Sequence, residues 1–213
     1  LGRPLLAAAD FNGDGLVDLV NQLGIYVTSG GSGYQYSVCP VVEWREAVVG
    51  DFDGNGHLDV VARRDDTVLT LLRGDGQGAF SETFSDVAGF VVGLAAADFD
   101  ADTVDDVAVL RSKTNAPKPG DEVDILVAYG RPFQSLEAAV VVGRVRGLNQ
   151  IVAGRLTADT PADIVIKTVG AESGILRGAV TRQLVSSLVM RTKAPGSYAV
   201  HADVTSVRTI AAG

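Results

Sequence analysis

The chain contains very little cysteine, histidine or aromatic residue. Its 213 residues include one cysteine, two histidines and one tryptophan, and aromatic residues make up 6% of the total. A single cysteine, Cys39, excludes an internal disulfide, and its apolar surroundings predict a small buried residue. A fold held together by disulfide bonds is therefore excluded.

The sequence also lacks the patterns of membrane spans and of common enzymes. No run of 18 apolar residues occurs, so we predict no membrane span. Cys-x-x-Cys, Gly-x-Ser-x-Gly and the nucleotide-binding glycine loops are missing. His201, with Asp203 two residues later, fits a satisfied core histidine better than a general base. We predict no catalytic residue and no organic cofactor.

Acidic residues are plentiful and lie mostly in the first part of the chain. Residues 1–130 carry 8 basic and 21 acidic side chains, net −13, while residues 131–213 carry 10 and 5, net +5, which sum to −8. The arginines of the second part lack the clustering and aromatic neighbours of nucleic-acid-binding surfaces. No nucleic-acid partner is predicted.

Much of the acid gathers in a nine-residue loop that occurs three times: DFNGDGLVD at 10–18, DFDGNGHLD at 51–59 and DFDADTVDD at 98–106. Oxygen-bearing side chains stand at loop positions 1, 3, 5 and 9, and the backbone carbonyl at position 7 offers another oxygen. Because Ca²⁺ takes six to eight oxygen ligands, we predict up to three structural Ca²⁺ ions. The predicted ligands are Asp10, Asn12, Asp14, Leu16 and Asp18; Asp51, Asp53, Asn55, His57 and Asp59; and Asp98, Asp100, Asp102, Val104 and Asp106.

Two other interpretations of these loops are weaker. A turn rich in Asp, Asn and Gly need not bind metal, but three copies in one register disfavour this explanation. An EF-hand would need glutamate at position 12, where the chain has Asn21, Ala62 and Val109. The segments that follow the loops alternate as strands do. Three bound Ca²⁺ ions would add +6 and leave a net charge of about −2.

The spacing of the loops predicts the architecture. They recur after 41 residues (51 − 10) and then 47 residues (98 − 51), with about four expected strands in each unit. Such periods are typical of β-propeller blades. We therefore predict one all-β domain over 1–213, a propeller or propeller segment with four full blades and a partial fifth. The expected units are 5–45, 46–92, 93–149, 150–196 and 197–213.

The fourth unit aligns with the others but lacks part of the acidic pattern. Arg155 stands at position 1 and Thr157 at position 3, while Asp159 and Asp163 remain. A guanidinium group would repel Ca²⁺ and can bridge carboxylates through two parallel hydrogen bonds. We expect Arg155 to replace the ion in this unit.

The loops and the hairpins that follow them resemble the FG-GAP/VCBS repeat family, the Ca²⁺-binding blades of integrin α-subunit propellers and of many bacterial secreted proteins. The pattern D-x-[DN]-x-[DN]-G-x-x-D matches fully in loops one and two, whereas Thr103 replaces the glycine in loop three. The family usually forms propellers of about seven blades. Three alternatives follow: a fragment, a smaller closed ring, or closure by another chain or segment.

The resemblance implies an extracellular module, either secreted or at the cell surface, with the periplasm as the alternative compartment. We interpret the chain as a Ca²⁺-stabilised scaffold, of the kind used in cell adhesion, that binds protein or carbohydrate. The alternative is the substrate platform of a secreted carbohydrate-active enzyme. The ions are expected to be structural, because a saturated oxygen cage leaves no coordination position for a substrate.

Overall fold

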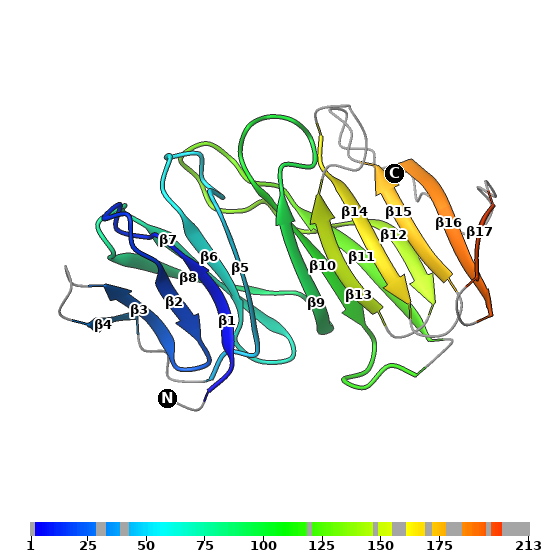
Figure 1. Cartoon of the computed structure of the whole chain (residues 1–213), viewed down its shortest axis with the longest axis horizontal. Coiled ribbons are helices and arrows are strands. Elements are labelled where there is room, and N and C mark those ends of the chain that lie inside the picture. The colour runs from blue at the N-terminus through cyan, green and yellow to red at the C-terminus, as the bar shows by residue number, and fades with distance from the viewer. Residues whose placement is uncertain are drawn as a thin grey trace.

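The computed structural model describes residues 3–28, 33–38, 43–118, 121–146, 149–154, 161–168, 172–177, 185–194 and 197–201. Within these ranges the regular elements are all β-strands, arranged in four antiparallel sheets that each follow chain order (Figure 1). The all-β class predicted from the sequence is confirmed. None of the described residues belongs to a helix long and apolar enough to cross a membrane.

The strands of the four sheets have the following bounds. The first sheet contains β1 (Leu5–Ala9), β2 (Asp18–Asn21), β3 (Gly24–Thr28) and β4 (Tyr34–Val38). The second contains β5 (Glu46–Gly50), β6 (Asp59–Arg63), β7 (Val68–Gly74) and β8 (Phe80–Asp86). The third contains β9 (Phe90–Ala97), β10 (Asp106–Ser112), β11 (Glu122–Ala128) and β12 (Val140–Arg146). The fourth contains β13 (Asn149–Gly154), β14 (Asp163–Thr168), β15 (Glu172–Arg177), β16 (Val185–Ala194) and β17 (Ser197–His201).

The last strand differs from the sequence-based expectation. Residues 197–213 were predicted to begin a fifth unit, but β17 pairs with β16 and extends the fourth sheet. The register joins Val189 to His201 and Arg191 to Ala199. The free edge of β16 carries unpaired backbone N–H and C=O groups, and β17 pairs with them.

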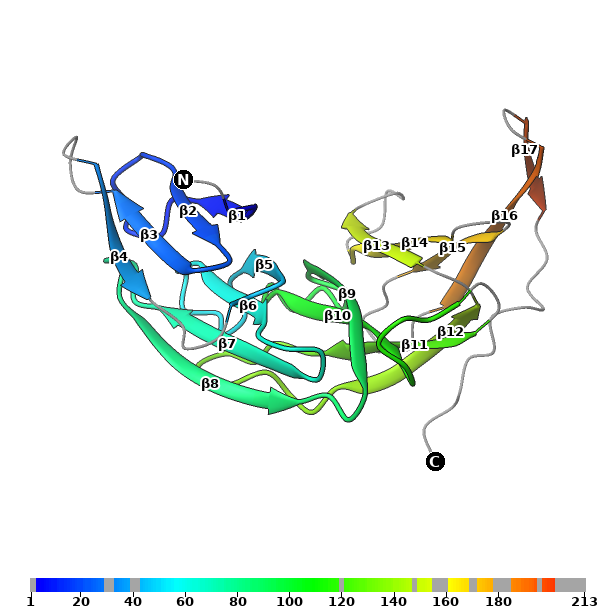
Figure 2. The ribbon, with the colours of Figure 1, turned by 90° about the horizontal axis from the view of Figure 1, so that it is seen from below.

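The four sheets follow an open arc (Figure 2). Their first strands lie side by side, with β1 against β5, β5 against β9 and β9 against β13. These strands are rich in Ala, Val and Gly, whose small side chains let neighbouring sheets approach closely. The described strands form an arc that does not close on itself, so a closed propeller remains a prediction (Figure 2).

Three apolar cores fill the spaces between neighbouring sheets. Because residues on a strand alternate between its two faces, one strand can contribute side chains to the cores on both sides of its sheet. Val60 and Ala62 of β6 pack toward the first sheet, whereas Val61 between them packs toward the third. In the same way, Val109 of β10 faces the second sheet and Leu110 faces the fourth. The second and third sheets are therefore apolar on both faces.

Among the residues that the structure describes, no sheet lies over the outer face of the first sheet. Leu5 and Val17 are 59% and 55% exposed. The residues that occupy the position of Val17 in the later loops, Leu58, Asp105 and Ala162, are partly or fully buried. The end of the arc therefore presents an apolar surface at the place where other sheets make contact.

Candidate metal loops

Each predicted metal loop joins the first and second strands of its sheet and has the same backbone shape. Positions 4 and 6 have positive φ in every copy: 73° and 81° at Gly13 and Gly15, 65° and 84° at Gly54 and Gly56, and 63° and 75° at Ala101 and Thr103. Glycine adopts this backbone conformation without strain, whereas a residue with a β-carbon is strained in it. Loop three therefore has the shape of the other two loops despite Ala101 and Thr103.

We predict that Thr103→Gly will stabilise the metal-free protein. A β-branched residue in the left-handed region is strained by about 1–3 kcal/mol, which exceeds the greater chain entropy of glycine in the unfolded state. We expect the free energy of unfolding to rise by about 1 kcal/mol in urea titrations with EGTA. Thr103→Ala, which keeps the β-carbon, should give a smaller gain. An unchanged or lower stability in Thr103→Gly would contradict the strain argument.

The position-1 carboxylate closes each loop by accepting backbone N–H groups from within it. The N–H of position 6 donates to it in all three loops, at 2.8 Å from Gly15 to Asp10, 2.8 Å from Gly56 to Asp51 and 3.1 Å from Thr103 to Asp98. The position-5 side chain in turn accepts the N–H of position 7, at 2.7–2.9 Å. These bonds fix the tight turn that the Asp and Asn side chains favour.

The position-9 aspartate of each loop is fully buried and ties the loop to the rest of its sheet. One of its oxygens accepts the N–H of the position-2 phenylalanine, and the other accepts an N–H at or just after the end of the third strand. The first bond measures 2.8 Å from Phe11 to Asp18, 2.9 Å from Phe52 to Asp59 and 2.8 Å from Phe99 to Asp106. The second measures 2.7 Å from Thr28, 2.8 Å from Gly74 and 2.9 Å from Gly130.

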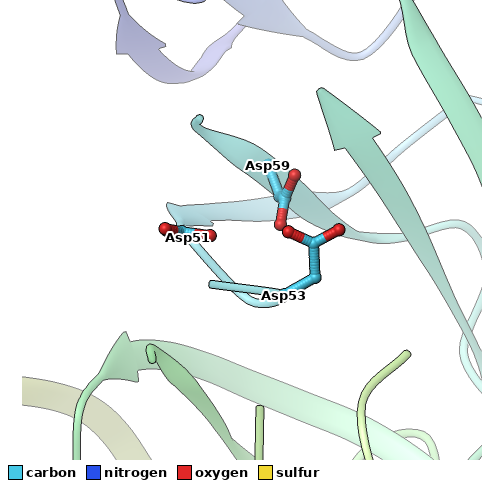
Figure 3. Close-up of side chains that lie close together, drawn as sticks. All are labelled: Asp51, Asp53 and Asp59. Atoms are coloured by element: carbon cyan, nitrogen blue, oxygen red, sulfur yellow. The ribbon is translucent and has the colours of Figure 1, made fainter. Parts of the chain in front are cut away.

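Loops two and three each bring three carboxylates together. In loop two, oxygen atoms of Asp51, Asp53 and Asp59 all lie within 4.8 Å of one another. Figure 3 shows the carboxylates of Asp53 and Asp59 facing each other, with Asp51 beside them. Asp98, Asp100 and Asp106 form the equivalent cluster in loop three. Such a donor set suits a hard cation that prefers oxygen.

The position-9 carboxyls of these two loops are hard to ionise without a cation. Burial raises the pKa of Asp59 to about 7; Asp53 and Asp51 raise it too, while the N–H groups of Gly74 and Phe52 lower it. The same balance, with burial as the largest cause, raises the pKa of Asp106 to about 7. A bound divalent cation would offset this penalty, because it favours the charged form of every carboxylate around it.

Loop one differs at position 3, where Asn12 replaces an aspartate. Asp10, Asp14 and Asp18 do not form a cluster like those of loops two and three. The Asp14 carboxylate accepts a 2.7 Å hydrogen bond from the Thr28 hydroxyl, which lowers its pKa together with the Leu16 N–H. Three carboxylates therefore converge in two of the three loops predicted to bind metal.

The remaining predicted residues are placed as follows. His57 is exposed, Leu16 is exposed and Val104 is buried, and their carbonyls remain predicted ligands. In the fourth unit Asp163 is buried, while Arg155, Thr157 and Asp159 lie outside the described residues. Cys39 and Asp203 also lie outside them, as does the side chain of His201.

Two groups of residues in the loops escaped the sequence analysis. The position-2 phenylalanines Phe11, Phe52 and Phe99 each lie in a different core between sheets. A phenylalanine at position 2 of every loop is the sequence feature that could have predicted this buried role. Asp105, at position 8 of loop three, contacts loop two, and nothing in the local sequence indicates this contact.

Comparisons with known proteins agree with the repeat found in the sequence. Residues 42–109 match the family described as FG-GAP-like repeat, which confirms the resemblance seen in the loops. No curated protein sequence matches the chain. A solved structure, the V. cholerae biofilm matrix protein Bap1, is similar with 16% sequence identity and a TM-score of 0.42. The alignment covers 98% of this chain and 42% of that one, so the chain spans less than half of Bap1.

Proposed function

We propose that this chain, which carries FG-GAP-like repeat sequence over residues 42–109, is a Ca²⁺-stabilised β-module of an extracellular protein. In this proposal its sheets form a scaffold on which a protein or carbohydrate ligand binds. The observation that carries the proposal is the pair of converging carboxylate clusters in loops two and three. They occupy the same loop positions in two sheets, so a chance cluster of surface acids is a poor explanation.

The donor set of each cluster fits Ca²⁺. Asp51, Asp53 and Asp59 would hold an ion in loop two, with Asn55 and the His57 carbonyl as further oxygen donors. Asp98, Asp100 and Asp106 would do so in loop three, with Asp102 and the Val104 carbonyl. All of these donors are oxygens, which hard cations prefer. Loop one offers Asp10, Asn12, Asp14, Asp18 and the Leu16 carbonyl as a third, weaker site.

A bound ion would neutralise the carboxylates that converge in the loop. Residues of the loop itself join the loop to the rest of the fold. The position-9 aspartate holds the loop to the third strand, while the position-1 aspartate closes the turn. The position-2 phenylalanine anchors the loop in the core between two sheets. An ordered loop therefore fixes the contact between neighbouring sheets.

The compartment and the kind of partner follow from this chemistry. We propose an extracellular compartment, because extracellular Ca²⁺ modules bind the ion at about 10⁻⁴–10⁻³ M, where it is abundant. The apolar outer face of the first sheet, with Leu5, Val17, Tyr34 and Tyr36 exposed, is the natural contact for a further sheet that extends or closes the arc. We propose that such a sheet comes from another chain or from a further segment of the same protein.

Calorimetric titration of Ca²⁺ into EGTA-stripped protein tests the metal assignment. We expect at least two sites, and we expect Asp53→Asn and Asp100→Asn each to weaken one of them towards the affinity of loop one, where Asn12 already stands at the same position. Exchanging the exposed Glu82 for glutamine removes one negative charge outside the three loops and should leave the number of sites unchanged. A chain that takes up no Ca²⁺ in this titration would overturn the proposed role.

A further inference from the structure

Loops two and three, which belong to different sheets, are joined directly by hydrogen bonds. The side chain of Asp105 accepts the N–H of Asp51 at 3.0 Å, and the N–H of Asp105 donates to the carbonyl of Asp51 at 2.9 Å. Asp51 is the position-1 residue of loop two, and Asp105 is next to Asp106, the position-9 residue of loop three. The two predicted metal loops therefore hold each other through a reciprocal pair of bonds.

A second connection runs through the segment that follows β11. The N–H of Gly130 donates to the Asp106 carboxylate at 2.9 Å, and the N–H of Phe133 donates to the carbonyl of Asp53. One short segment thus contacts a predicted ligand residue of loop three and a predicted ligand residue of loop two. The two connections are independent, because they use different residues of both loops.

Asp105 fits closely against the second sheet at Gly50. A β-carbon at Gly50 would lie 2.7 Å from the Asp105 carboxylate oxygen and 2.9 Å from its β-carbon. The residues that precede Asp10 and Asp98 are alanines, Ala9 and Ala97. Glycine stands before the first aspartate only in the loop that receives Asp105, so the chain leaves room for this side chain there.

Loops one and two are not joined in this way. Position 8 of loop two is Leu58, whose side chain packs against the core between the first and second sheets. Residues 10–18 and 51–59 are described throughout, and no hydrogen bond connects them. If Ca²⁺ binding at one loop affects Ca²⁺ binding at another, we therefore expect this effect only between loops two and three.

We propose that Asp105 is a positioning residue that couples the two metal loops, so that Ca²⁺ binding to loop three strengthens Ca²⁺ binding to loop two and the reverse. An ion in loop three restrains residues 98–106 and with them Asp105, which holds the Asp51 backbone in place. Less ordering then remains for the second ion to impose, and its affinity rises. This inference rests on the proposed Ca²⁺ role.

Each loop carries its own reporter for the test. The position-6 N–H groups of Gly15, Gly56 and Thr103 bond the position-1 carboxylates, so their NMR signals follow loops one, two and three separately during a Ca²⁺ titration. The loop-two affinity is measured in the unmodified chain and in Asp100→Asn. The loop-three affinity is measured in the unmodified chain and in Asp53→Asn.

We expect each of the two sites to weaken about fivefold or more when the other is disabled, and by the same factor in both directions, because coupling is reciprocal. Asp105→Ala should lower this factor about twofold or more, while the remaining backbone bond to Asp51 and the segment after β11 carry the rest. Asp105→Asn, which removes the same charge but keeps an oxygen acceptor for the Asp51 N–H, should retain most of it. The coupling factor is the ratio of two Ca²⁺ affinities of one site, measured with and without the substitution in the other loop. A loss of affinity caused by the missing Asp105 charge lowers both of these affinities equally, so it leaves the ratio unchanged. Loop one should not respond to any of these changes.

Gly50→Ala provides a second route to the same result, because its β-carbon would displace the Asp105 carboxylate without altering a ligand. It should lower the coupling factor as Asp105→Ala does. Two sites that fill independently in the unmodified chain, or a coupling factor that is undiminished in Asp105→Ala and Gly50→Ala, would overturn the inference while leaving the Ca²⁺ role intact. Absence of binding at both loops would instead overturn the proposed function.

Discussion

Removal of Ca²⁺ by EGTA is expected to lower the free energy of unfolding by about 2.7 kcal/mol for each site that was held at a hundredfold excess over its dissociation constant. With loops two and three occupied, the loss is about 5 kcal/mol. The physical reason is that the ion binds the folded loop, where Asp51, Asp53 and Asp59 converge, and binds the unfolded chain poorly. Thermal and urea unfolding with and without Ca²⁺ measure this difference.

A matched variant separates this effect from nonspecific action of the chelator. The double variant Asp53→Asn, Asp100→Asn keeps both loop backbones but removes one carboxylate from each cluster. Its stability should respond to EGTA much less than that of the unmodified chain, because both sites are weakened. If the unmodified chain has the same melting temperature in EGTA and in excess Ca²⁺, the loops do not stabilise the fold through metal.

Truncation of Phe52 to alanine is expected to lower the free energy of unfolding by about 3–5 kcal/mol, the range for deleting a buried aromatic ring. Phe52 is fully buried between the second and third sheets, among Val61, Val91 and Val107. Its loss would leave a cavity beside Asp59, whose carboxylate accepts the Phe52 N–H. Urea unfolding in excess Ca²⁺ measures the cost.

Phe84→Ala is the control, because Phe84 on β8 is 55% exposed and its ring contacts the Arg64 guanidinium 4.8 Å away. Deleting this ring should cost about 1 kcal/mol or less. Similar losses in Phe52→Ala and Phe84→Ala would show that the position-2 phenylalanine is not the anchor of its loop. A Ca²⁺ affinity that also falls in Phe52→Ala would link the core to the loop.

The parts of the fold that sequence reasoning predicted are those encoded locally. The alternation that follows each loop identified strands, and the repeat of the loops grouped them into units. The backbone shape of loop three was harder to predict from the sequence. Thr103 departs from the glycine pattern, yet the bonds to Asp98 hold it at a φ of 75°. Ala101 also has a positive φ, but alanine is common in every kind of structure, so its presence in the sequence does not indicate this conformation.

The sequence by itself determined the all-β class, the repeat and the acidic loops, because a nine-residue turn and an alternating strand depend on neighbours along the chain. Tertiary structure alone decided which residues meet across sheets: Asp105 with Asp51, the three phenylalanines with their cores, and β17 with β16. Such contacts depend on how sheets stack and on which edges are free. Asp51 and Asp105, for example, are 54 positions apart, so no local pattern records their pairing.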